Sequence, residues 1–293
     1  MKRRNFTDRD ISRLALWARR LAFFSLAATL VAVIIVRSGA LDIVPALSTL
    51  AGALLLAVVA ILFAGGAGMV IWRTGAGGGR HAVTALAIGL ALIAYPLYLG
   101  VRAYRLPAIY DITTDPIDPP QFDAIARLRP REANPVTYAG LYTAEQQNKA
   151  YPDIEPDDTN ASPQEAYDAA MKVIAKRRWR VVDARPPQAG LPRMIDTRAA
   201  AGAAMRDGII EAVARTPILG FRDDVVVRVR PTADGARIDV RSASRYGRHD
   251  FGTNARRVRN LIDDIDDVLS RPPPVKRPSP PPAPAAKGSQ ANR

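Results

Sequence analysis

The chain contains no cysteine and only two histidines, His81 and His249. It therefore has no disulfide, thiolate zinc site, cysteine nucleophile or lipidated cysteine. Only one histidine, His249, lies within residues 106–270, and no H-x-x-x-H or D-x-D-x-D spacing occurs, so nothing predicts a metal site. We expect neither a metal nor another cofactor.

The positive charge is not spread evenly, although the 293 residues carry a net charge of +13. Residues 1–20 carry +5, residues 21–105 carry +4, residues 106–270 carry −1 and residues 271–293 carry +5. The excess therefore lies beside apolar segments and in a tail. Because nucleic-acid-binding domains concentrate positive charge, this distribution argues against nucleic acid as a partner.

Three segments are apolar and almost free of charge, at residues 21–36, 43–72 and 82–101. Their lengths are close to or above the ~20 residues needed to cross a membrane. No small-residue cleavage site follows the first segment, so we expect no removable signal peptide. Small residues recur at four-residue spacing and are candidates for helix contacts: Ala64, Gly68, Ala85 and Gly89. We predict three transmembrane helices within residues 21–105.

Residues 1–20 form a basic segment before the first span. Thr7 and Asp10 are a candidate capping box, and Ile11, Leu14 and Trp17 follow at helical spacing. The segment is either a short helix at an anionic membrane surface or a charged helical lead-in to the span. We favour the lead-in.

The orientation follows from basic residues near the spans. Seven Lys/Arg precede the first span and two arginines separate the second from the third, whereas the first loop has one arginine and one aspartate. The positive-inside rule then predicts a cytoplasmic N-terminus and an extracytoplasmic chain after Val101. Arg102 and Arg105 mildly oppose this orientation. We predict a multi-pass inner-membrane protein with a periplasmic C-terminal domain.

Residues 106–161 are rich in proline and aspartate, which disfavours long helices and central strands. One short helix is expected near residues 144–150. Residues 106–168 hold twelve acids and four bases, whereas residues 169–262 hold twenty bases and nine acids. We predict that residues 106–161 form an arm packed on a basic domain of residues 162–270.

The domain begins with a helix signal, because Ser162 can cap, Pro163 suits the first turn and Glu165 completes a capping box. Strands are expected over residues 179–184 and 193–199. The segment up to about residue 215 is compatible with a strand or a short helix.

A β-hairpin follows. Val225, Val227 and Val229 fall on one face of its first strand, and Asp234-Gly235 is a turn signal. In the returning strand apolar residues alternate with arginines, so one face should pack on helices and the other should be lined with arginines. We predict an α+β fold: a three-helix transmembrane region followed by a two-layer sandwich of antiparallel sheet and helices. Residues 271–293 contain eight prolines and are expected to form a disordered tail.

Three separated stretches resemble a known family: DITTDPIDPPQF, AYPDI, and GFRDDVVVRVRP continued by RIDVRSASRYGRHDFGTNARRVRNL. The family is the uncharacterised domain of unknown function 1499, and the similarity spans about residues 106–268. The strand beginning at Trp179 and the Ser-Arg-x-Gly-x-x-Asp-x-Gly-x-Asn segment occur in the family's order. The resemblance implies a domain often found behind membrane segments, but no accepted activity or catalytic residue.

The loop after the hairpin offers a candidate hydrolase constellation of Ser242, Ser244, His249 and Asp250. No G-x-S-x-G elbow accompanies it, and an adjacent His-Asp pair does not establish triad geometry. The aspartates between residues 263 and 267 resemble a calcium run, but they are more typical of the solvated face of a helix. We predict no catalytic residue.

Anion binding is the sharper hypothesis for this loop, because arginines flank the start of a helix, where N–H groups and the macrodipole favour negative charge. The candidate ligand-binding residues are Arg245, Arg248, His249, Asn254, Arg256 and Arg257. The alternative, which we favour, is that these arginines pair internally with Asp250, with Asp223 and Asp224, or with the acidic arm.

We therefore expect a membrane protein that presents a non-enzymatic module, for envelope assembly or for binding an anionic envelope ligand. Its expected partners are the lipid bilayer and either an anionic envelope component or another membrane protein. The alternative is a hydrolase-like envelope enzyme that uses the arginine-rich loop.

Overall fold

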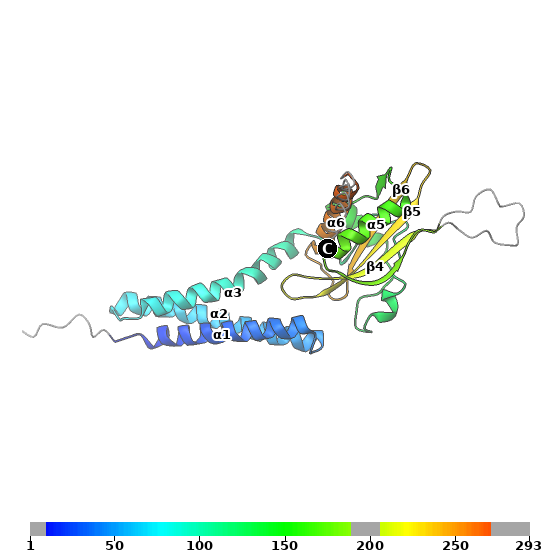
Figure 1. Cartoon of the computed structure of the whole chain (residues 1–293). Helices are drawn as coiled ribbons and strands as arrows, with labels where there is room; N and C mark the ends of the chain where they lie inside the picture. Colours follow the sequence, from blue (N-terminus) through cyan, green and yellow to red (C-terminus); the bar gives the residue numbers. More distant parts are fainter. Residues whose placement is uncertain (1–9, 189–205, 271–293) are drawn as a thin grey trace, which may run out of the picture.

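The computed structural model describes residues 10–188 and 206–270. It has two parts, a bundle of three helices and an α+β domain at one end of the bundle (Figure 1). The bundle consists of α1 (Arg13–Ser38), α2 (Ile43–Thr74) and α3 (Gly79–Arg105). All three helices are long and apolar enough to cross a membrane.

The bundle packs through small side chains. Alanines of all three helices are buried between them, and Ser25 Oγ donates a hydrogen bond of 2.8 Å to the carbonyl of Ala53. Of the residues expected to pack, Ala64 and Ala85 are buried, and a Cβ on Gly89 would lie 2.5 Å from Ile61. Close approach of helices at small residues is typical of membrane bundles. Gly68, by contrast, faces outward.

The first helix begins later than the proposed capping box. α1 starts at Arg13, and Ile11 instead forms an isolated bridge with Gly77. The helix-capping role predicted for Asp10 is therefore wrong, and Thr7 lies outside the described residues. From Arg13 onward the helix continues without a break into the apolar segment, as expected for a lead-in.

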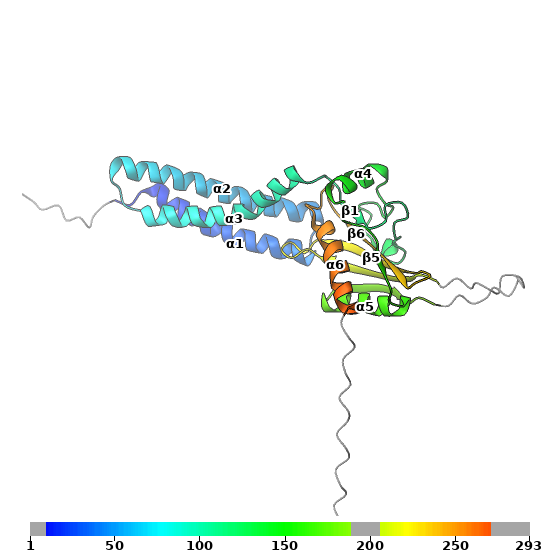
Figure 2. The same cartoon turned by 90° about the horizontal axis from the view of Figure 1, so that it is seen from above.

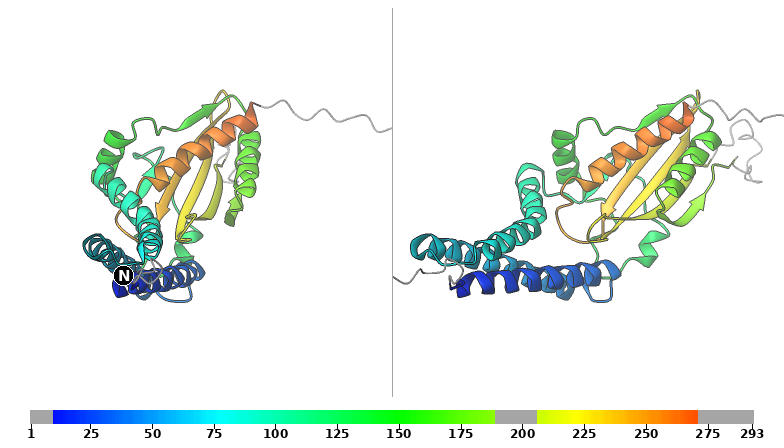
Figure 3. Two further views of the ribbon diagram at one scale, coloured as in Figure 1. Left: turned by 90° about the vertical axis from the view of Figure 1, so that its left-hand side faces the viewer. Right: turned by 60° about the vertical axis from the view of Figure 1, so that its left-hand side comes forward.

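The last turns of α3 bend toward the domain (Figure 3). Pro96 lies inside this helix. Because proline removes a backbone hydrogen bond and crowds the preceding turn, we attribute the bend to it. The bend brings the end of α3 beside the start of α6, the last helix of the domain (Figure 2).

The domain is built on an antiparallel sheet whose strand order is β1-β6-β5-β4-β3, with β2 also paired to β6. The strands are β1 (Asp111–Thr113), β2 (Asp157–Thr159), β3 (Arg180–Arg185), β4 (Gly208–Arg215), β5 (Arg222–Pro231) and β6 (Ala236–Ser244). The segment left open between strand and helix is thus strand β4. The strand expected over residues 193–199 lies outside the described residues, as does the tail of residues 271–293.

Two helices cover one face of the sheet, α5 (Pro163–Lys176) and α6 (Thr253–Leu269) (Figure 3). The capping box at the start of α5 is formed, because Ser162 accepts from the Glu165 N–H and Glu165 accepts from the Ser162 N–H. Val225, Val227 and Val229 are buried against these helices. The α+β prediction is confirmed.

Residues 106–161 extend the sheet at β6 and cover part of its opposite face. They contribute β1, β2, the 3-10 helix η1 (Ile125–Leu128) and α4 (Leu141–Ala150), which is the short helix expected near residues 144–150. Phe122 and Ile125 pack on Val213, Val226 and Ala243 in a small apolar core. The arginine-lined face of the hairpin is therefore closed by the acidic segment that precedes it.

Candidate functional site

The arginines of the hairpin surround Asp239, which is fully buried on β6. Its carboxylate forms ion pairs with Arg228, Arg230 and Arg237 at 2.9 to 3.2 Å. Asp115 adds a second carboxylate, 3.2 Å from Arg230 and 3.1 Å from Arg237. These arginines are neutralised within the domain.

Two further arginines lie deeper beneath residues 106–161. Arg241 and Asp111 are both fully buried and form a bidentate pair, with N–O distances of 2.9 and 2.8 Å. Arg245 pairs with Asp224 at 2.7 Å, and Arg129 reaches the same carboxylate at 2.6 Å. Buried charges are tolerated when they are paired in this way.

The helix-covered face of the hairpin has a different polar network, centred on Asn254. The Asn254 side chain donates 2.8 Å to the Tyr110 carbonyl and 2.9 Å to Ser244 Oγ, and it accepts from Ser242 Oγ at 2.9 Å. Arg257 donates to Ser242 Oγ at 2.9 Å and also pairs with buried Asp223. These contacts tie the start of α6 to the end of β6, to the residue before β1 and to the start of β5.

Asp250 occupies the position where an external anion was expected. Its carboxylate accepts the N–H groups of Gly252 at 2.8 Å and Asn254 at 2.7 Å, at the start of α6. Burial raises the pKa of Asp250, and these two N–H bonds offset part of that rise. The anion at this helix N-terminus is therefore the protein's own carboxylate, so ligand binding has to depend on side chains.

His249 joins the domain to the bundle. Its Nε2 lies 3.3 Å from the Ala103 carbonyl and 3.2 Å from the Leu106 carbonyl at the end of α3, and its Nδ1 accepts the Phe251 N–H at 2.9 Å. Both ring nitrogens are thus engaged by backbone groups. Because the hydroxyls of Ser242 and Ser244 bond to Asn254 instead, these residues do not assemble a hydrolase triad.

Of the six predicted ligand-binding residues, four are therefore engaged within the protein and two are exposed. Arg245, Asn254 and Arg257 are buried and support the loop, and His249 is half-buried at the junction with α3. Arg248 and Arg256 remain exposed. The sequence placed all six in a loop and the helix start that follows it, but it could not show which side chains turn inward.

The exposed arginine of α6 meets two residues that sequence reasoning did not select. Arg102, on the bent end of α3, donates 2.8 Å to the Tyr98 hydroxyl, and Arg256 interacts with the same hydroxyl. Within residues 10–188 and 206–270, neither arginine forms an ion pair with a carboxylate. We call Tyr98, Arg102 and Arg256 the tyrosine cluster.

A second set of arginines lies at the turn between α1 and α2. Arg37 donates 2.7 Å to the Pro217 carbonyl in the β4–β5 loop, and Arg215 reaches the Arg37 carbonyl at 3.4 Å. Arg215 and Arg222 are directly opposite in the β4–β5 register, and both are exposed. We call Arg37, Arg215 and Arg222 the turn cluster. No carboxylate pairs with it in the part of the chain that the structure describes.

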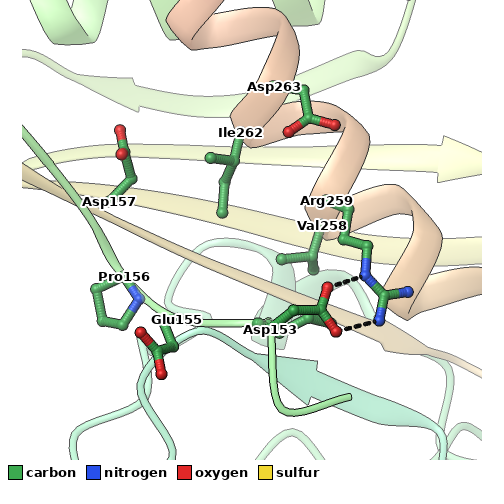
Figure 4. A pocket seen from close by; sticks show the side chains of 9 residues that line it. Asp153, Glu155, Pro156, Asp157, Val258, Arg259, Ile262 and Asp263 are labelled. Atoms are coloured by element: carbon green, nitrogen blue, oxygen red, sulfur yellow. Dashed lines mark hydrogen bonds and ion pairs between the residues drawn. The ribbon is translucent and has the colours of Figure 1, made fainter.

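A pocket of about 390 Å³ lies between residues 153–157 and α6 (Figure 4). Asp153, Glu155 and Asp157 line one side, and Asp153 forms a double hydrogen bond with Arg259 on the other side. Burial and the nearby Asp266 raise the pKa of Asp157 to about 6. This pocket opens beside α6 and not onto the arginine face of the hairpin. Among the described residues no group of acidic or histidine side chains is arranged to hold a metal ion.

No curated protein and no solved structure gives a significant match to this chain. A family model does match, over residues 111–265, which include the strands, α5 and α6 except for its last turn. The matched region contains the Asp111–Arg241 pair, the Asn254 network and the Asp250 cap, whereas the bundle lies outside it. The chain belongs to the family described as protein of unknown function (DUF1499).

Proposed function

We propose that the three helices span a membrane and hold the α+β domain outside the cytoplasm, where it binds an anionic envelope ligand without catalysing a reaction. The uneven distribution of basic residues around the three apolar segments supports this orientation. The turn between α1 and α2 and the end of α3 both contact the domain, so the two connections belong to one side of the membrane.

The tyrosine cluster carries the anion-binding proposal. Two guanidinium groups lie at the Tyr98 hydroxyl, and no carboxylate within the described residues pairs with them. On the sheet face that residues 106–161 cover, neighbouring arginines such as Arg228 and Arg230 share an aspartate. A phosphate or carboxylate bound between Arg102 and Arg256 would supply the missing negative charge through charge-assisted hydrogen bonds.

The test is calorimetric titration of inorganic tripolyphosphate into the full-length protein in an uncharged detergent. We expect saturable binding that weakens with added salt. Arg256→Ala, combined with Arg248→Ala at the other exposed residue of the predicted set, should weaken binding at least about tenfold, because a charge-assisted hydrogen bond from Arg256 alone contributes roughly 1.5 kcal/mol or more. Arg102 is left intact because it also contacts the loop at Gly252.

The matched control removes two exposed positive charges from elsewhere, Lys172 on α5 and Arg206 before β4. Lys172→Ala with Arg206→Ala lowers the net charge equally and should leave the affinity unchanged. Equal weakening in both double variants would show nonspecific charge attraction and would refute the proposed site.

The orientation has a separate test. A topology reporter fused after residue 105 should be active only if that position is extracytoplasmic. A cytoplasmic signal would overturn the proposed location of the domain.

A further inference from the structure

The tyrosine cluster and the turn cluster lie at the same end of the bundle of membrane-spanning helices. α1 ends at Ser38, next to Arg37, and α3 ends at Arg105, one turn beyond Arg102. Both helix ends contact the domain, which lies at that end of the bundle (Figure 2). The two clusters therefore occupy the layer in which apolar helices give way to polar chain.

The turn cluster supports an anion-binding site independently of the tyrosine cluster. Arg215 and Arg222 face each other across two strands, and like charges directly opposite each other destabilise a sheet. The Arg222 guanidinium also approaches Gly39 in the α1–α2 turn, where a Cβ would be 3.9 Å from Nη2. Asp42, the acid nearest to Arg37 in sequence, forms no ion pair in the described part of the chain, and Asp223, which follows Arg222, pairs with Arg257 instead. A bound anion would remove this repulsion.

Exposed aromatic residues locate the same layer on α3. Tyr104 is 93% exposed and stands between Arg102 and Arg105. Earlier in the same helix, Tyr95 stacks on Tyr98, which lies one turn after it, with ring centroids 6.5 Å apart. Tyrosine near the end of an apolar helix is typical of the headgroup region of a bilayer. The arginines beside these rings are then at the height of the lipid phosphates.

We propose that the two clusters bind the phosphate groups of acidic phospholipids in the leaflet that faces the domain. This inference rests on the proposed function for the chemistry of the ligand, and it names the source of that ligand. The surrounding leaflet presents phosphates at the level of both clusters. The domain is thereby held against the bilayer at two separate points, at the α1–α2 turn and at the end of α3.

The test measures how spin-labelled phosphatidylglycerol and phosphatidylcholine associate with the full-length protein in vesicles that contain both lipids. The variant combines Arg215→Gln with Arg222→Gln and so removes the repelling pair while keeping Arg37 in its contact with Pro217. We expect the wild type to select phosphatidylglycerol at least about threefold, since each basic residue near a surface contributes roughly 1 kcal/mol. The variant should lose at least half of this preference, and Lys172→Gln with Arg206→Gln should retain it.

The outcome also separates this inference from the proposed function. If the Arg215/Arg222 variant keeps the full lipid preference while tripolyphosphate binding still depends on Arg248 and Arg256, the lipid assignment is wrong and anion binding stands. If tripolyphosphate fails to bind as well, both proposals are refuted. Selective loss of lipid preference in the variant, with tripolyphosphate binding retained, supports the lipid assignment.

Discussion

Arginine has opposite roles on the sheet and at the end of the domain that faces the bundle. On the face of the hairpin that residues 106–161 cover, each arginine has an aspartate within hydrogen-bonding distance, as Arg241 has Asp111. At the bundle, the described part of the chain offers the arginines of the turn and tyrosine clusters no such partner. The residue type is the same, and the difference lies in what the fold places beside it.

This difference shows why the total charge of a chain is a poor guide to its partners. Residues 106–270 are nearly neutral in sum, yet their positive charges divide into a paired set and an unpaired set. The acidic segment before the sheet neutralises the paired set. Only the unpaired set is left to interact with a ligand, so the comparison can be tested by removing members of each set.

The largest effect is expected for Arg241→Met, which leaves Asp111 charged and fully buried. Breaking a buried pair on one side costs about 3 to 5 kcal/mol. Thermal unfolding of the full-length protein in detergent should show a large decrease in stability. Arg248→Met, at an exposed position that forms no ion pair with a described residue, should change the free energy of unfolding by less than about 0.5 kcal/mol.

The double variant Arg241→Met with Asp111→Leu is the internal control for this prediction. It removes both charges and should recover most of the lost stability, because apolar side chains of similar size often replace a buried pair without cost. If Arg248→Met destabilised the protein as much as Arg241→Met, the distinction between the two sets would be wrong.

The second effect concerns the network that holds Arg257 inward. Asn254→Ala leaves the Tyr110 carbonyl and the hydroxyls of Ser242 and Ser244 without their amide partner. The Tyr110 carbonyl keeps the Ser244 N–H and Ser242 Oγ keeps Arg257, but Ser244 Oγ loses its buried donor. An unsatisfied buried group costs about 1 to 3 kcal/mol, and we expect a loss in that range in the same unfolding assay. Thr253→Ala, at the neighbouring half-buried position, is the control and should change stability by less than half as much.

The third effect concerns Arg37, whose contribution to stability should lie between those of the paired and unpaired arginines. Its side chain is exposed but donates to the carbonyls of Pro217 and Ile218. Arg37→Met should remove about 1 kcal/mol from the contact between the β4–β5 loop and the bundle. Hydrogen exchange of residues 216–221 should become faster, while exchange in β6 stays unchanged. Exchange that stays slow in the loop would show that Arg37 does not hold the domain there.

The smallest effect is expected for the reverse case, an aspartate that has no basic partner in the described part of the chain. The pKa of Asp157 is raised to about 6, so at pH 7 its charge opposes folding. Asp157→Asn should increase the free energy of unfolding by less than about 1 kcal/mol, since solvent screens this half-exposed group. As the pH falls through 6, the wild-type carboxyl takes up a proton in the folded state and the difference should shrink. An increase that persists unchanged at pH 4 would contradict this explanation.

Much of the domain could be predicted because its signals are local. The alternation of the hairpin predicts its two faces, and the same period of two, continued past residue 240, places Ser242 and Ser244 on the helix side and Arg245 on the other side. The capping box of α5 was equally local. The sequence did not reveal that Asp250 fills the helix N-terminus, since the turn geometry of Gly247 and Gly252 decides this.

The candidate site was predicted less well because it joins distant segments. Tyr98 and Arg102 read as the end of an apolar span, and nothing in their spacing connects them with Arg256. The pairing of Arg215 with Arg222 depends on the length of the loop between two strands, and one of these strands was itself ambiguous. A cluster of charged residues from separate elements can be recognised only when the β4–β5 register and the bend of α3 are known.

The position of β1 has a consequence for how the domain is made. β1 is the first strand after the last helix of the bundle, but it pairs with β6, so that Asp111 and Arg241 meet across 130 residues. At a synthesis rate of 5 to 20 residues per second, roughly 7 to 26 s separate the two partners. During that interval the acidic segment has emerged without its basic partners. The sheet can therefore close only after nearly the whole domain has been synthesised, and any cellular factor that protects the emerging chain acts before then.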